Sequence, residues 1–233
     1  EDPIEYRVPG VNQSQVNPKI GFTFATGLRA FLRQDPNVIM VGEIRDVETV
    51  EIAIHAALTG HLVLSTLHTN DAITTIARLL DMGAPAFLIA STLTIIIAQR
   101  LVRKICPHCI TSYTLDKKAI AELEQHFPMK EVLDIMAREK AIVSTKDALS
   151  SLLFYRGSGC AQCGNDGYKG RIGVYEILEI SPAMTDLLIS HPTREQLQAQ
   201  AKKDGMITLA QDGFIKAKNG MTTIEELIRV TKE

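Results

Sequence analysis

Two short apolar runs separated by a helical pattern constrain the fold of this chain more than any other feature. Val38–Gly42 and Leu62–Leu67 have the length and apolar content of strands that are buried on both faces of a sheet. Val47–Leu58 lies between them with helical spacing and is followed by a glycine, and Ala72–Leu80 has a second helical pattern. This alternation is typical of βαβ units, so we predict an α/β fold with a parallel sheet over about residues 1–104.

Two further apolar segments flank this unit. Thr23–Gln34 has helical spacing, with Thr23 as the expected N-cap and Pro36 as the end signal. Phe87–Ala98 is the most apolar run, and its twelve residues are too few to span a bilayer, so we predict a buried helix there. Because no signal peptide opens the chain, we expect a cytoplasmic protein with no direct membrane span.

The rest of the chain has a different pattern. Two cysteine pairs surround a charged helical insert at about residues 116–139. Beyond residue 180 we expect three short helices, opened by the capping signals Ser181-Pro182, Thr193-x-x-Gln196, and Thr222/Thr223 followed by Glu225/Glu226. We therefore predict three segments, residues 1–104, 105–175 and 176–233.

The ends of the two predicted strands carry titratable side chains. Glu43 follows the first strand and His68 follows the second, and ligands of open parallel sheets bind at the carboxyl ends of the strands. A carboxylate there can orient or deprotonate a water, and an imidazole beside it can hydrogen-bond a phosphate. Four carboxylates could together hold a hydrated magnesium ion: Asp35, Glu43, Asp46 and Asp71. The alternative is that Glu43 occurs by chance and that His68 is structural.

Two CxxC pairs indicate a metal site. Each pair offers two thiolates, and together Cys106, Cys109, Cys160 and Cys163 complete a closed, structural zinc site. The alternatives are disulfides or a site emptied by oxidation. The 25 basic and 27 acidic residues give a net charge of −2 and form no basic run, so a zinc-ribbon nucleic-acid binder is disfavoured.

Three segments resemble motifs of the type II/IV secretion ATPase family, in that family's order and spacing. Leu32–Asp46 resembles the Walker B region, Thr59–Asp71 resembles the His box, and Glu1–Tyr6 resembles the end of the Asp box. The resemblance extends to the cysteines and to Gly220–Glu226, and is closer to pilus-extension ATPases than to general secretion pathway protein E. It implies a RecA-like P-loop NTPase core, truncated at its N-terminal side, with a tetracysteine zinc subdomain and C-terminal helices.

The resemblance also implies a role for each matching residue. Glu43 is expected to be the general base or water-orienting carboxylate. Glu5 and Asp2 are expected on the magnesium and water side of the same site, where the carboxylate chemistry above also places Asp35 and Asp46 as cofactor-binding residues. His61 and His68 are expected to couple the γ-phosphate to the neighbouring domain, and Arg29 and Arg33 are expected to be arginine sensors, with Arg7 a weaker candidate. Arg29 and Arg33 are four residues apart and share a helix face, which a solvated surface would also explain.

The phosphate-binding motif G-x-x-x-x-G-K-[ST] does not occur in these 233 residues. In the resembling family it lies upstream of the Asp box, so we expect residues 1–233 alone to bind ATP weakly and not to turn over. The intact protein is expected to be a homohexameric, Mg²⁺-dependent ATPase that powers type IV pilus assembly or type II secretion through an inner-membrane platform protein. The alternative is a non-hydrolysing interaction or regulatory module of the same fold.

Overall fold

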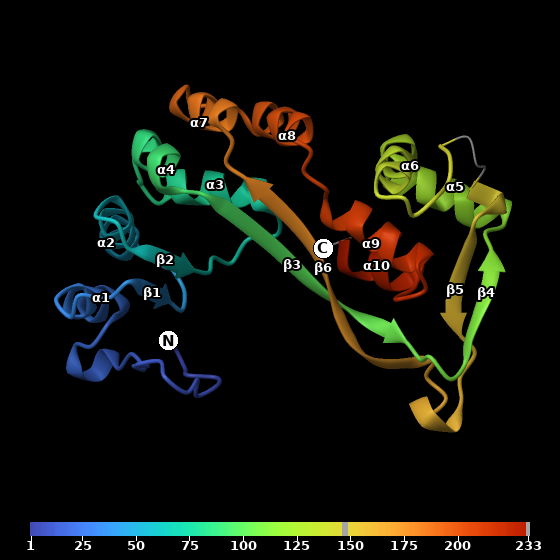
Figure 1. Cartoon of the computed structure of the whole chain (residues 1–233), viewed down its shortest axis with the longest axis horizontal. Helices are drawn as coiled ribbons and strands as arrows, with labels where there is room; N and C mark the ends of the chain where they lie inside the picture. Colours follow the sequence, from blue (N-terminus) through green and yellow to red (C-terminus); the bar gives the residue numbers. More distant parts are fainter. Residues whose placement is uncertain (146–148, 232–233) are drawn as a thin grey trace. The chain divides into compact units, whose positions relative to one another are not determined.

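The computed structural model describes residues 1–145 and 149–231. The chain divides into two compact units, and each is built from two separate stretches. Glu1–Ile96 and Leu178–Asp204 form the first unit, and Ile97–Ile177 and Gly205–Glu233 form the second. The boundary falls inside two strands, β3 (Ile95–Ile105) and β6 (Tyr168–Glu179), which pair in a two-stranded sheet (Figure 1). The three segments predicted from the sequence stay a prediction.

The first unit contains the predicted βαβ arrangement. Strands β1 (Val38–Val41) and β2 (Leu62–Ser65) are parallel and pair from Val38↔Leu62 to Val41↔Ser65. Helices α1 (Phe24–Leu32) and α2 (Val47–Leu58) pack on one face of this sheet, and their shared core is Leu28, Ile39, Val41, Ala53 and Ala56. The other elements of the unit are a 3-10 turn η1 (Pro18–Ile20) and the helices α3 (Ala72–Asp81), α4 (Ala86–Thr92), α7 (Pro182–Ile189) and α8 (Arg194–Lys203).

Local capping chemistry sets where these helices begin. The Thr23 side chain accepts a hydrogen bond from the backbone N–H of Thr26, which confirms Thr23 as the N-cap of α1. Asp46 caps α2 and Asp71 caps α3 in the same way. Helix α2 has the predicted bounds and ends before Gly60, whose φ of 98° suits glycine.

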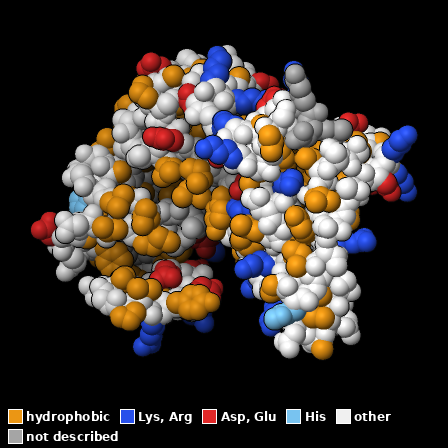
Figure 2. Space-filling view, turned by 45° about the vertical axis from the view of Figure 1, so that its right-hand side comes forward, with side chains coloured by type: hydrophobic (Ala, Val, Ile, Leu, Met, Phe, Trp, Pro, Cys, Tyr) orange, Lys and Arg blue, Asp and Glu red, His pale blue; other side chains and the backbone are white. Residues whose placement is uncertain are grey.

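The prediction that the two strands are buried on both faces is wrong for the described chain. Val38, Met40, Leu62 and Leu64 share one face of the sheet and are between 48% and 57% exposed. Among the described residues the sheet has only two strands, and α1 and α2 pack on its opposite face. Figure 2 shows hydrophobic side chains gathered at the surface of this unit.

The apolar run Phe87–Ala98 does not form the predicted buried helix. It divides between α4, which ends at Thr92, and β3, which starts at Ile95. The consecutive β-branched residues from Thr94 to Ile97 favour a strand over a helix. Ile95 and Ile97 are exposed, so the run is also not buried throughout. Across residues 1–145 and 149–231, no helix is long and apolar enough to cross a membrane.

The second unit surrounds the cysteine pairs. Its strands β4 (Ile110–Thr114) and β5 (Leu153–Gly157) are antiparallel and pair from Ile110↔Gly157 to Thr114↔Leu153. The charged insert forms two helices, α5 (Lys117–His126) and α6 (Met129–Arg138). The remaining elements are η2 (Leu149–Ser151), η3 (Ala161–Cys163), α9 (Leu209–Lys218) and α10 (Ile224–Thr231). One core joins the insert to the C-terminal helices and includes Leu123, Val132, Met136, Phe154, Phe214 and Leu227.

Four helices follow residue 180 in the described chain, so the prediction of three is wrong. Helices α7, α8 and α10 start near the predicted signals. The additional helix is α9, whose N-cap Thr208 forms a reciprocal capping box with Gln211. The signal Thr-x-x-Gln at 208–211 is the same one that marks α8 at Thr193.

Candidate functional site

Glu43 lies just past the carboxyl end of β1, and the structure brings His68 to it. The backbone N–H of Ile44 donates to the Thr66 carbonyl at 3.0 Å, which continues the pairing of the two chain segments beyond the strands. The Nε2 atom of His68 lies 2.9 Å from Oε2 of Glu43. Since an ionised carboxylate only accepts hydrogen bonds, Nε2 carries the proton. Two residues that are 25 positions apart thus form one polar site.

Arg45 occupies the other carboxylate oxygen. Its Nη2 atom donates to Oε1 of Glu43 at 2.5 Å, and its Nη1 atom lies 3.4 Å from Oδ2 of Asp2. The hydrogen bond from Arg45 lowers the pKa of Glu43, against the opposing effect of burial, and the bond from His68 lowers it further. Glu43 is therefore ionised at neutral pH although it is only 8% exposed.

Arg45 is a site residue that none of the sequence motifs indicated. Its position is two residues after Glu43 in extended chain, and side chains at i and i+2 of an extended segment point to the same side. The i, i+2 spacing of Glu43 and Arg45 could therefore have indicated that Arg45 belongs to the site. The resulting site contains Glu43, Arg45, His68 and Asp2, with a buried carboxylate and an imidazole that is 85% exposed.

The structure does not bring the predicted magnesium carboxylates together. Asp46 Oδ1 accepts hydrogen bonds from the backbone N–H and the hydroxyl of Thr49, at 2.8 and 2.9 Å. Asp71 caps α3 and pairs with Arg194 at 2.7 Å. Asp35 precedes β1 and so lies at the opposite end of the strand from Glu43. In the described part of the chain, no three carboxylates come close enough to share one ion.

The other predicted site residues have described contacts elsewhere or lie exposed on their own segments. His61 precedes β2, and its Nδ1 donates to the Ala56 carbonyl at 2.9 Å, at the end of α2. Arg29 of α1 pairs with Glu48 of α2 at 2.5 Å, and both side chains are exposed. Arg33 is the exposed C-cap residue of α1, and Glu5 is exposed in the N-terminal segment. Their roles stay predictions.

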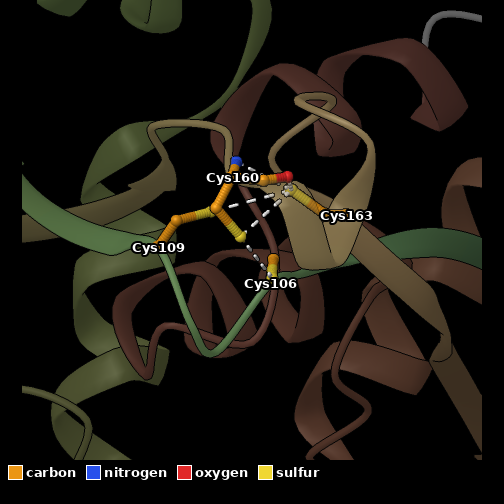
Figure 3. Close-up of side chains that lie close together, drawn as sticks. All are labelled: Cys106, Cys109, Cys160 and Cys163. Carbon is orange, nitrogen blue, oxygen red and sulfur yellow. Dashed lines mark hydrogen bonds between the residues drawn. The ribbon is translucent and has the colours of Figure 1, made fainter.

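The four cysteines converge in the second unit. Cys106 and Cys109 come from the chain between β3 and β4, and Cys160 and Cys163 come from the chain around η3 (Figure 3). All four sulfur atoms lie within 4.8 Å of one another. The sulfur atoms of Cys106 and Cys160, and those of Cys109 and Cys163, are 3.9 Å apart, and those of Cys160 and Cys163 are 3.7 Å apart. These separations exclude disulfides, in which the sulfurs are about 2.05 Å apart.

This geometry fits a tetrahedral metal ion. Zinc–thiolate bonds of about 2.3 Å place the sulfurs at the corners of a tetrahedron with edges of about 3.8 Å. The surroundings of Cys163 also favour its thiolate form. Desolvation raises the pKa of Cys163, but the backbone N–H groups of Cys160 and Gly167 donate to its sulfur at 3.3 Å, and the pKa falls to about 7. Burial instead raises the pKa of Cys109 to about 11, so this thiol would need a bound cation to ionise at neutral pH.

Comparison with known proteins gives concordant results. The family model described as "Type II/IV secretion system protein" matches residues 1–229. The chain is 45% identical to the type IV pilus assembly ATPase PilB of Pseudomonas aeruginosa, covering 100% of this chain and 38% of that protein. It is 43% identical to the type II secretion system ATPase E of Vibrio cholerae, covering 100% of this chain and 42% of that protein. The chain therefore spans about two fifths of the length of these relatives.

Solved structures support the α/β fold. The pilus retraction motor PilT with bound ADP is 30% identical and has a TM-score of 0.64, covering 100% of this chain and 51% of that chain. The ATPase DotB of Legionella pneumophila is 21% identical with a TM-score of 0.60, covering 99% of this chain and 50% of that chain, which shows a shared fold alone. The fold class predicted from the sequence is confirmed.

Proposed function

Because the chain belongs to the type II/IV secretion system protein family, we propose that it forms part of an ATPase motor that powers type IV pilus assembly or type II secretion. Relatives of the two classes match this chain with similar identity, 45% and 43%, so the proposal covers both. The observation that carries it is the hydrogen-bonded group formed by Glu43, Arg45 and His68. A buried, ionised carboxylate beside two donors suits activation of water next to phosphate groups.

In this proposal Glu43 orients the water that attacks the γ-phosphate and accepts its proton. One oxygen of Glu43 accepts a bond from Arg45 and the other accepts a bond from His68. A carboxylate has about four lone-pair sites, so it can still accept a hydrogen bond from water. The lowered pKa makes Glu43 a weak base. Phosphoryl transfer tolerates this, because its loose transition state depends more on positioning and charge than on proton removal.

The hydrogen-bond donors to Glu43 and the metal have separate roles in the proposal. Arg45 holds the Glu43 carboxylate in place, and His68, which is largely exposed, contacts the γ-phosphate. Magnesium bound with ATP supplies charge neutralisation, and it needs only one or two carboxylates besides phosphate oxygens and water. Asp2 is the predicted magnesium-side residue that lies beside the Glu43 group. The phosphate-binding loop motif is not among these residues, so they provide the water-activating side of the site.

The cysteine cluster is proposed to bind one structural zinc ion through Cys106, Cys109, Cys160 and Cys163. With four protein ligands no position is left for a substrate, so its contribution is to folding. The intact protein is proposed to be a homohexamer that acts on an inner-membrane platform protein. Metal analysis of unoxidised intact protein should find one zinc per chain, and Cys160→Ser should lower that content. A zinc-free wild-type protein would contradict the assignment.

The catalytic proposal is tested by ATPase assay of the intact protein with Glu43→Gln. The amide keeps the shape of the side chain but cannot take the proton, so kcat should fall by about a hundredfold or more while nucleotide affinity stays within about threefold. The matched control is Glu51→Gln on the exposed face of α2, which should keep wild-type turnover. Wild-type turnover of the Glu43 variant would refute the base assignment, and an inactive wild-type protein would favour the non-hydrolysing module.

A further inference from the structure

Arg103 lies three residues before Cys106, and both its side chain and its backbone N–H donate to the carboxylate of Glu226. Its Nε and Nη2 atoms donate to Oε1 of Glu226 at 3.0 and 2.9 Å. Its backbone N–H donates to the other oxygen, Oε2, at 2.8 Å. Glu226 belongs to α10 and is separated from Arg103 by 123 positions in the sequence. The strand that leads into the first cysteine pair is therefore attached to the C-terminal helix through both its backbone and its side chain.

The same guanidinium contacts the chain that leaves the second cysteine pair. Nη1 of Arg103 lies 3.4 Å from both carboxylate oxygens of Asp166, and Cζ lies 4.0 Å from the ring centre of Tyr168. The backbone N–H of Asp166 in turn donates to the Cys163 carbonyl at 3.2 Å. Arg103 thus lies in the strand that leads into the first cysteine pair and contacts the chain that leaves the second.

The carboxylate of Glu226 is buried, and both of its oxygens accept hydrogen bonds. It is 2% exposed, and Arg229 adds hydrogen bonds to its two oxygens at 3.0 and 2.8 Å. Desolvation would raise its pKa, but the bonds from Arg229 and Arg103 outweigh it and lower the pKa to about 2. A buried carboxylate of this kind is stable only while its donors stay in place. Movement of Arg103 would therefore be transmitted to α10.

The start of α10 is attached to the metal-site segment at two more points. The hydroxyl of Thr222 donates to the Arg103 carbonyl at 2.8 Å, and the backbone N–H of Ile105 donates to the Met221 carbonyl at 3.1 Å. These bonds run from the segment just before Cys106 to the residues that precede α10. The placement of the first cysteine pair and the docking of α10 hence share one hydrogen-bond network.

We propose that Arg103 and Glu226 are positioning residues of the cysteine metal site, and that metal binding and the docking of α10 stabilise each other. The proposal rests on the metal site proposed above. Four sulfurs bind one ion only when both cysteine pairs are held in register, and Arg103 joins the strand that leads into the first pair to the chain that leaves the second. Coupling of this kind is reciprocal, so an ion that fixes the two pairs also fixes Arg103 and, through Glu226, α10.

The first test measures zinc release from the intact, zinc-loaded protein to a chromogenic chelator. Glu226→Gln keeps the size of the side chain but loses the charge that binds Arg103, and release should become about tenfold to a hundredfold faster, as for other residues that orient metal ligands. Glu225→Gln is the matched control, because it makes the same change at the adjacent, exposed position and should stay within about twofold of wild type. Equal release rates for the two variants would overturn the proposal.

The second test starts from the wild-type protein. Hydrogen exchange of the wild-type protein is compared with zinc bound and with zinc removed, and exchange over residues 224–231 should increase when the metal is removed. In Glu226→Gln, exchange over α10 should be the same with and without zinc. If Glu226 has a merely structural role, the variant would instead raise exchange by the same factor in both states and keep the difference between them. Metal-independent exchange of α10 in wild type overturns the coupling alone. A wild-type protein that binds no zinc overturns the metal site as well.

Discussion

Asp46 offers the sharpest test of how the strand ends are used. The sequence predicts that its carboxylate binds magnesium, whereas the structure places Oδ1 on the backbone N–H and the hydroxyl of Thr49 at the start of α2. The two roles respond differently to substitution. Asparagine caps helices about as well as aspartate but is a much poorer ligand for magnesium, and alanine can do neither. We therefore compare Asp46→Asn with Asp46→Ala in the intact protein.

The structure sets the size of the expected effect. Loss of an N-cap side chain costs about 1 kcal/mol. Thr49 is completely buried, so its hydroxyl loses its acceptor in Asp46→Ala, which adds about 1–2 kcal/mol. The alanine variant should thus destabilise α2 by at least about 2 kcal/mol, a change of about thirtyfold in its opening equilibrium. Asp46→Asn keeps the acceptor and loses only the charge at the helix N-terminus, about 0.5 kcal/mol.

Hydrogen exchange of residues 47–58 measures this local stability, and ATPase activity against magnesium concentration measures the metal role. We expect Asp46→Ala to increase exchange about thirtyfold and Asp46→Asn to increase it by about threefold or less, with half-saturating magnesium unchanged in the asparagine variant. Unchanged exchange in Asp46→Ala would refute the capping role. If Asp46→Asn keeps the helix but needs about tenfold more magnesium, the carboxylate also binds magnesium, and capping is not its only role.

Three further outcomes follow from the second unit. The pKa of Glu226 is lowered from 4.5 to about 2, so the stability that its charge contributes is complete above pH 4.5 and is lost as the pH falls toward about 2. Acid unfolding followed by tyrosine fluorescence should show this loss of stability in the wild-type protein. The loss should be smaller in Glu226→Gln, which has no carboxylate to protonate at this position. Phe214→Ala removes a fully buried ring whose centre lies 5.2 Å from that of Phe127, and should cost about 3–5 kcal/mol in chemical denaturation, whereas a cost under about 1 kcal/mol would contradict the packing. Gly157→Ala would place its Cβ 2.0 Å from the Gly167 carbonyl oxygen and should lower the zinc content of the purified protein, and an unchanged content would contradict this close approach.

Local chemistry explains what could be predicted from the sequence. Thr23 marks the start of α1 because its side chain satisfies a free backbone N–H of that helix, and this requirement depends only on neighbouring residues. The pairing of Glu43 with His68 follows from parallel strands, whose carboxyl ends meet at one edge of the sheet. The spacing of the four cysteines in two CxxC pairs likewise predicts that they form one site.

Other features could not be predicted, because two roles compete for the same residue or because the partner residue is distant in the sequence. The sequence predicts Asp46 and Asp71 as magnesium ligands because they follow strands, but the same positions precede helices, and each carboxylate caps the helix that follows it. The strand β3 could not be separated from a helix by apolar content, since Phe87–Ala98 is apolar throughout most of its length. Arg103 and Glu226 carry no local signal for each other, because 123 positions separate them.

The discontinuous build of both units has a consequence for synthesis on the ribosome. Glu1–Ile96 requires Leu178–Asp204 to complete the first unit, and the core of the second unit joins Leu123 to Leu227. Neither unit can finish folding when its N-terminal stretch leaves the exit tunnel. At ordinary rates of translation, the first stretch waits roughly 5–20 s for its partner, with the surfaces of α4 and α3 that α7 and α8 later cover open to other nascent chains. This chain should therefore depend on chaperones during its synthesis more than a protein of equal size with contiguous domains.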